Sequence, residues 1–169
     1  KNSKSEGEKL EEDINVRTVV EKTLKEVEMK GDKAVRELSK KFDNFDRPNF
    51  LLTESEIEAA MQKVSTRDME DIKFAQNQIR RFAKEQMNSM SDVEIETLPG
   101  VILGHKNIPV QSVECYVPGG KFPMVASAHM SVLTASVAGV PRIISSAPPV
   151  NGEPHPAIVA SMKMGGANE

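Results

Sequence analysis

One segment, residues 114–149, most constrains how this chain can fold. It begins with a short apolar run, passes through a Pro-Gly-Gly turn at residues 118–120, and continues through apolar sequence of helical length to a β-branched stretch at residues 142–146. This order predicts a buried strand, a turn, a helix and a second strand, which together form a parallel crossover in an open α/β sheet. The turn then lies at the carboxyl end of the first strand, where such sheets bind ligands.

The character of the sequence changes near residue 92, from charged and helical in its spacing to rich in β-branched residues, Gly and Pro. We therefore expect a flexible tail at residues 1–13, a helical segment at residues 14–92 and an α/β part at residues 93–169. Two alternating runs joined by Pro99-Gly100 predict a β-hairpin at the start of the last part. The predicted fold is α/β, with an N-terminal helical segment and a β-hairpin before an incomplete parallel β/α unit.

Composition excludes several classes of function. The net charge of −3 leaves no dominant basic face, and few aromatic residues are present, so we expect no nucleic-acid partner. No continuous apolar run approaches the roughly 20 residues that cross a bilayer, so we expect no membrane partner. Residues 1–13 are polar and contain no apolar core of a secretory signal. The single cysteine can form no internal disulfide, so the expected location is the cytoplasm.

The sequence offers few catalytic or metal-binding side chains. Cys115 falls inside the apolar strand pattern, which favours a small buried hydrophobe over a nucleophile, because no histidine neighbours it in sequence. The three histidines, His105, His129 and His155, are far apart and match no metal-ligand spacing, so we expect no metal site built from this chain alone.

Two side chains near the Pro-Gly-Gly turn are candidates for ligand contact. Tyr116, the only tyrosine, ends the first predicted strand, where its ring could pack on a flat ligand or simply cover the sheet edge. His129 falls one or two turns into the following helix, where its imidazole could face a ligand or be a hydrogen-bonded, partly buried side chain. The residues alone leave the choice open for Tyr116, whereas for His129 they favour the hydrogen-bonded, partly buried side chain.

Several motifs resemble the histidinol dehydrogenase family, in that family's order and spacing. The resemblance covers nearly everything from about residue 14 onward. It rests on the motifs Leu98-Pro99-Gly100-Val101, Pro109-Val110-x-Ser112-Val113, Tyr116-Val117-Pro118-Gly119-Gly120 and Val137-Ala138-Gly139-Val140, and on the strand that ends at Pro148-Pro149.

The resemblance implies a homodimeric oxidoreductase that depends on NAD and zinc and is built on incomplete Rossmann-like domains. Tyr116 occupies the place of the family's NAD-contacting tyrosine, and Pro118, Gly119 and Gly120 would shape the turn around the cofactor. The family's zinc ligands and its Glu-His proton-transfer pair lie beyond the position of residue 169. We therefore expect an N-terminal fragment that holds no catalytic residue and no zinc ligand and is inactive alone.

The segment Ser127-Ala128-His129-Met130 departs from the usual histidinol dehydrogenase pattern. It is more similar to the branch that oxidises sulfonated diols such as 2,3-dihydroxypropane-1-sulfonate. A histidine near the substrate would suit an anionic sulfonate by charge pairing, so we expect His129 to contact substrate. L-histidinol is the alternative substrate. A non-catalytic helical interaction module, suggested by the charged helices of residues 14–88, is the alternative of another class.

Overall fold

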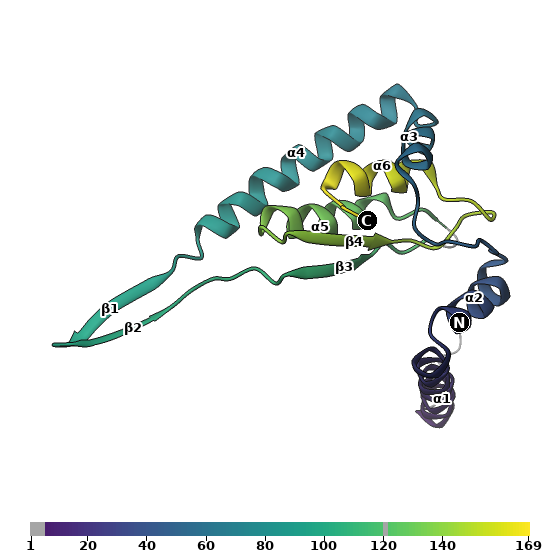
Figure 1. Cartoon of the computed structure of the whole chain (residues 1–169), viewed down its shortest axis with the longest axis horizontal. Helices are drawn as coiled ribbons and strands as arrows, with labels where there is room; N and C mark the ends of the chain where they lie inside the picture. The colour runs from purple at the N-terminus through teal and green to yellow at the C-terminus, as the bar shows by residue number, and fades with distance from the viewer. Residues whose placement is uncertain (1–5, 120–121) are drawn as a thin grey trace. The chain divides into compact units, whose positions relative to one another are not determined.

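The computed structural model describes residues 6–119 and 122–169. Its contacts divide the chain into two compact units, one that ends at Pro48 and one that runs from Asn49 to Glu169. Figure 1 shows the elements of both units along the chain.

The first unit consists of two helices, α1 (Glu6–Lys30) and α2 (Asp32–Asp43), which pack on one another. Gly31 separates them with a φ of 55°, in the left-handed region that glycine adopts without steric cost. Ala34 is buried, whereas most of the apolar side chains of α1 are exposed, Leu24 at 64%. This unit therefore has very little core of its own.

The second unit is centred on two parallel strands, β3 (Ser112–Tyr116) and β4 (Arg142–Ser146), which pair in register from Ser112 with Arg142 to Tyr116 with Ser146. Helix α5 (Val125–Val137) joins them and packs on both. It ends before Gly139, whose φ of 80° turns the chain back toward the sheet. The apolar run after the Pro-Gly turn folds this way because a single helix connects two parallel strands most directly.

Three helices complete the second unit. Helix α6 (Pro156–Gly165) packs on α5, α3 (Glu54–Gln62) packs on α6, and α4 (Thr66–Asn88) packs on both α5 and α6 (Figure 1). Thr53 precedes α3 and forms a capping box with Glu56, the pattern that Thr-x-x-Glu in a sequence is typical of. The core lies between the two strands, α5 and α6, and consists of two clusters. The first contains Cys115, Val132 and Ile143. The second contains Val117, Ala128 and Ile158.

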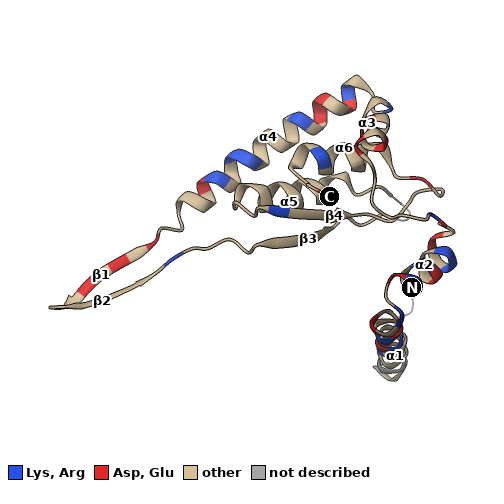
Figure 2. Cartoon of the chain, in the orientation of Figure 1, with Lys and Arg blue, Asp and Glu red and all other residues tan. Residues whose placement is uncertain are grey.

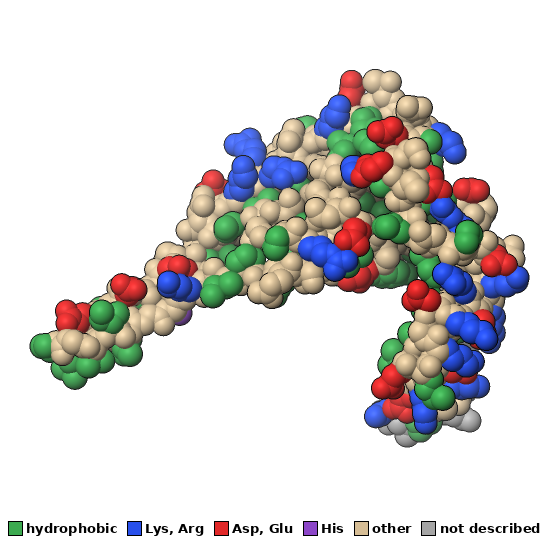
Figure 3. Space-filling view, in the orientation of Figure 1, with side chains coloured by type: hydrophobic (Ala, Val, Ile, Leu, Met, Phe, Trp, Pro, Cys, Tyr) green, Lys and Arg blue, Asp and Glu red, His purple; other side chains and the backbone are tan. Residues whose placement is uncertain are grey.

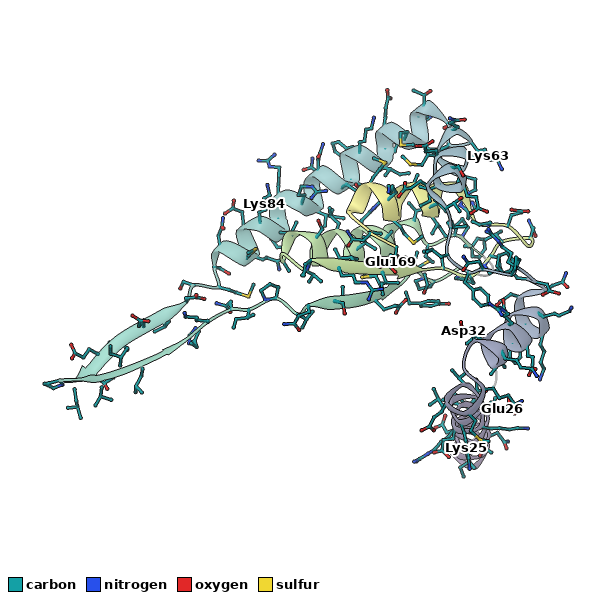
Figure 4. All side chains as sticks on the ribbon, in the orientation of Figure 1. Lys25, Glu26, Asp32, Lys63, Lys84 and Glu169 are labelled. Atoms are coloured by element: carbon teal, nitrogen blue, oxygen red, sulfur yellow. The ribbon has the colours of Figure 1, made fainter. Side chains whose placement is uncertain are left out.

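The residues after α6 return to the free edge of β4. The Ser145 N–H donates to the Glu169 carbonyl at 2.8 Å, and the Glu169 N–H donates to the Ile143 carbonyl at 3.3 Å. This pair of bonds is the pattern of two neighbouring parallel strands. The Arg142 guanidinium adds a two-pronged contact to the Glu169 carboxylate at 2.8 and 2.9 Å, and Figure 4 shows Glu169 beside β4.

The hairpin of β1 (Val93–Leu98) and β2 (Val101–His105) extends from the end of α4. Its antiparallel register pairs Ile95 with Leu103 and Glu96 with Ile102. Successive side chains alternate between faces, so one face is apolar and the other carries Glu94 and Glu96. Figure 2 shows acidic positions along β1. Both faces are exposed along the whole hairpin.

The predicted α/β class is confirmed, with the helices, the hairpin and the parallel strand–helix–strand unit in the expected order. Helix α1 begins at Glu6, so part of the tail that we predicted at residues 1–13 is helical. The rest of that tail lies outside the described residues. The composition boundary near residue 92 lies inside the second unit, between α4 and β1, and the division into domains stays a prediction.

Candidate functional site

The carboxyl ends of β3 and β4 form an edge that presents one aromatic ring. Alternation along β3 buries Cys115 and turns the next side chain, Tyr116, outward, so that 58% of Tyr116 is exposed. Beyond it the Val117 N–H donates to the Ser146 carbonyl at 2.7 Å, which continues the pairing by one residue. Tyr116 therefore lies at the end of a fixed strand, beside Ser146, with its ring free to contact a ligand.

The turn that follows is held against the loop after β4. A Cβ placed on Gly119 would lie 2.7 Å from Pro148 Cγ and 3.3 Å from Pro148 Cδ, so this position accepts only glycine without movement. The Pro118 carbonyl accepts a bond from the Met124 N–H at 3.3 Å, just before α5 begins. Pro118 and Gly119 are half-buried, and Gly120 lies outside the described residues.

His129 is on the second turn of α5 and is only 4% exposed. Its Nδ1 lies 3.3 Å from the Nε2 of Gln76 on α4. Burial lowers the pKa of His129, because the charged imidazolium loses its hydration. The imidazole is therefore neutral near pH 7, and the charge pairing with an anionic sulfonate that we expected at this position loses its basis.

A pocket of about 360 Å³ borders His129. It lies where the first turns of α4, α5 and α6 meet, and its lining is mostly apolar apart from the imidazole and two carboxylates. The lining residues are Asp68, Asp71, Ile72, Ala75, Val125, Ala126, His129 and Ala157. Asp68 also accepts a bond from the Ser65 hydroxyl at 2.7 Å, in the cap of α4. The carboxylates favour a hydroxyl or a cation in this pocket over an anion.

Gln76 is the buried polar residue that the sequence analysis missed. It is 4% exposed, and its Nε2 also donates to the Ser161 carbonyl of α6 at 2.9 Å. A signal was present, because Gln76 falls four residues after the buried Ile72 and therefore on the same face of α4. An amide inside an apolar helical stripe indicates a specific partner across the helix interface.

The other candidates have plain structural roles. Cys115 belongs to the core, and burial is the largest cause that raises the pKa of its thiol, so the thiol stays protonated. Within residues 6–119 and 122–169, no three His, Cys, Asp or Glu side chains gather as a metal-binding group. In the same residues, no helix is both long enough and apolar enough to cross a bilayer.

These elements define an α/β protein with a ligand-accessible tyrosine at the carboxyl edge of a parallel strand pair. Comparison with known proteins gives the family: the histidinol dehydrogenase profile matches residues 6–169. The chain therefore belongs to the histidinol dehydrogenase family, which confirms the resemblance seen in its motifs.

Curated relatives and a solved structure agree with this assignment. The chain is 55% identical over 152 residues to histidinol dehydrogenase homolog 1 of Mesorhizobium japonicum, covering 90% of the chain and 30% of that protein. It is 42% identical over 155 residues to sulfopropanediol 3-dehydrogenase of Ruegeria pomeroyi, covering 91% of the chain and 35% of that protein. The crystal structure of histidinol dehydrogenase from Elizabethkingia anophelis superposes with a TM-score of 0.83 at 25% identity, over 100% of this chain and 36% of that one. The chain thus spans about a third of the length of these proteins.

Proposed function

We propose that the whole protein to which this chain belongs is an NAD-linked alcohol dehydrogenase that oxidises a small sulfonated diol. The observation that carries the proposal is the position of Tyr116, exposed at the carboxyl end of β3 and followed directly by the Pro118-Gly119 turn. An exposed ring and a glycine turn at this edge suit a flat ring and a phosphate-bearing cofactor. The family adds zinc and a homodimer to the proposal, with the zinc ligands outside this chain.

The order of the strands supports a cofactor site at Tyr116. The chain runs from β3 through α5 to β4, and then through α6 to the outer edge of β4, so both crossovers lead away from β3. The uncovered edge of β3 is therefore where strand order could reverse, and open α/β sheets bind dinucleotides at such a reversal. Tyr116, Pro118 and Gly119 would form one wall of the cofactor site, and Gly120, the next residue in sequence, is proposed as a further cofactor contact. NAD, when bound, accepts hydride from the alcohol carbon.

The choice of a sulfonated diol rests on similarity to the sulfopropanediol 3-dehydrogenase of Ruegeria pomeroyi, at 42% identity. The charges at the pocket do not support a sulfonated substrate, because His129 is neutral and the carboxylates of Asp68 and Asp71 line the same pocket. Those carboxylates are the specific observation that favours L-histidinol, a cationic amino alcohol, as the second candidate substrate. In either case we propose that His129 contacts the substrate as a hydrogen-bond donor.

Cofactor titration of the whole protein tests the role of Tyr116. Replacing it with Ala removes the ring and should raise the Kd for NAD at least tenfold, whereas Tyr116→Phe keeps the ring and should change the Kd much less. Phe74→Ala is the matched control, since Phe74 is a 67% exposed aromatic side chain on α4. An unchanged Kd in Tyr116→Ala would remove the cofactor wall from the proposal. Activity of the whole protein on 2,3-dihydroxypropane-1-sulfonate and on L-histidinol then decides the substrate.

A further inference from the structure

Gln76 is the one polar side chain of α4 that is buried among the described residues of that helix. Its amide bridges three helices: it approaches His129 Nδ1 on α5 at 3.3 Å and the Ser161 carbonyl on α6 at 2.9 Å. Ser161 is fully buried, and its hydroxyl is already donated to the Ala157 carbonyl at 2.6 Å. The amide is thus held at both contacts by groups that have little room to move.

These two contacts determine the orientation of the Gln76 amide and the tautomer of the His129 imidazole. A carbonyl oxygen can only accept, so the amide atom next to the Ser161 carbonyl must be the nitrogen. The same NH₂ group has a second hydrogen, which it can donate to His129 Nδ1, 3.3 Å from the amide nitrogen. Nδ1 must then be an acceptor, and a neutral imidazole whose Nδ1 accepts carries its proton on Nε2.

The other nitrogen of the imidazole remains for a ligand in the pocket. His129 borders the 360 Å³ pocket and Gln76 does not, and since Nδ1 is engaged with Gln76, Nε2 is the ring nitrogen left to contact a ligand there. Nε2 donates to no described residue. The ionisable groups that line this pocket are Asp68 and Asp71 of α4, while α5 and α6 contribute only Val125, Ala126 and Ala157 beside His129.

We infer that Gln76 is a positioning residue: it holds His129 as the neutral tautomer protonated on Nε2, so that the pocket presents a hydrogen-bond donor to an oxygen of the ligand. The inference rests on the proposed function for the identity of that ligand, an alcohol, and on the geometry alone for the tautomer. A hydroxyl is the best match, because it accepts from Nε2 and can donate to a carboxylate in turn. The pocket would then select its ligand by the direction of the hydrogen bond from Nε2 rather than by the charge of the ligand.

The tautomer of His129 can be measured in the unaltered protein. The whole protein is labelled with ¹⁵N-histidine, and the His129 signals are assigned by their loss in His129→Gln. We expect a neutral ring protonated on Nε2 at pH 7.5. A ring protonated on Nδ1, or an imidazolium, at this pH would overturn the inference.

Gln76→Glu tests the role of the amide directly. A carboxylate at this position accepts instead of donating, so Nδ1 gains a proton and the charged imidazolium is favoured. We expect the His129 ring to keep its second proton to higher pH, the pH profile of kcat/KM to move, and KM to rise about tenfold with a smaller change in kcat. Asn77→Asp is the matched control, since it makes the same chemical change at the next, exposed residue of α4.

The outcomes separate the inference from the proposed function. Gln76→Glu with an unchanged tautomer and an unchanged KM would reduce Gln76 to a packing residue and overturn the inference. If Gln76→Glu does not fold, the tautomer of His129 measured in the unaltered protein still decides whether the inference holds. An Nε2-protonated ring together with unaltered kinetics in His129→Gln would support the tautomer and count against the substrate contact in the proposed function.

Discussion

Gly119 and Pro148 lock together the two turns that follow the parallel strands. A Cβ on Gly119 would lie 2.7 Å from Pro148 Cγ, closer than side chains approach one another without movement. The turn after β3, which bears the proposed cofactor wall, is therefore positioned by the turn after β4. The glycine at this position is required by packing inside the chain, whatever it does for a ligand.

Gly119→Ala should therefore destabilise the chain by about 1–3 kcal/mol through overpacking. Pro148→Ala removes the two ring atoms nearest to the added methyl group. The double variant Gly119→Ala/Pro148→Ala should lose less stability than the sum of the single variants, and urea unfolding measures this coupling. Strict additivity would show that the two turns do not press on one another.

The sequence was sufficient where local rules agree with tertiary packing. The capping box at Thr53, the strand that ends before Pro148 and the helix between the strands were all predictable, because each depends on residues close together in sequence. The position of Tyr116 at the end of the first strand was also predictable, because it depends on the local strand pattern. These features fix the architecture around the proposed site.

The sequence did not predict which face of a helix is buried where only the neighbouring helices decide it. Helical spacing from Ile72 and Ile79 favours a buried Phe82, but Phe82 is 67% exposed and the buried positions of α4 are Ile72, Gln76 and Ala83. A long charged helix has apolar residues on more than one face, and only contact with α5 and α6 selects one of them. The partner of His129 could not be named, because Gln76 is 53 residues away in the chain.

The apolar face of the hairpin should promote self-association of the 169-residue chain. Val93, Ile95, Leu98, Val101 and Leu103 are each between 43% and 65% exposed, and Figure 3 shows hydrophobic side chains gathered at the end of the hairpin. Two strands alone do not bury enough surface to be stable in water. Leu103→Lys should shift sedimentation toward the monomer. Ile102→Lys, on the acidic face one residue away, is the matched control and should shift it less.

Core packing and surface pairing should contribute very differently to the stability of α6. Ile158 is 1% exposed, so Ile158→Ala should cost about 2–5 kcal/mol by leaving a cavity. Lys163 donates to the Glu54 carboxylate at 2.8 Å, but both side chains are well exposed. Glu54→Gln should therefore cost less than about 1 kcal/mol, and less again at high salt. Urea titrations of both variants check this, and a larger loss in Glu54→Gln would contradict it.

Burial of His129 should make stability depend on pH. Its pKa is lowered in the folded chain by desolvation, so between the folded pKa and the unfolded value of about 6.5 the unfolded state binds more protons. Stability from this group is therefore fully present above about pH 6.5 and is lost as the pH falls through that window. The slope reaches at most about 1.4 kcal/mol per pH unit.

Urea unfolding of the unaltered chain and of His129→Gln, measured from pH 7.5 down to pH 5, isolates this contribution. The unaltered chain should lose stability more steeply on acidification than the variant, because only the unaltered chain must keep a buried imidazole neutral. The difference in unfolding free energy between the unaltered chain and His129→Gln should be constant above pH 7 and should become smaller below pH 7. Parallel curves over the whole range would mean that the imidazole takes up its proton as easily in the folded chain as in the unfolded one.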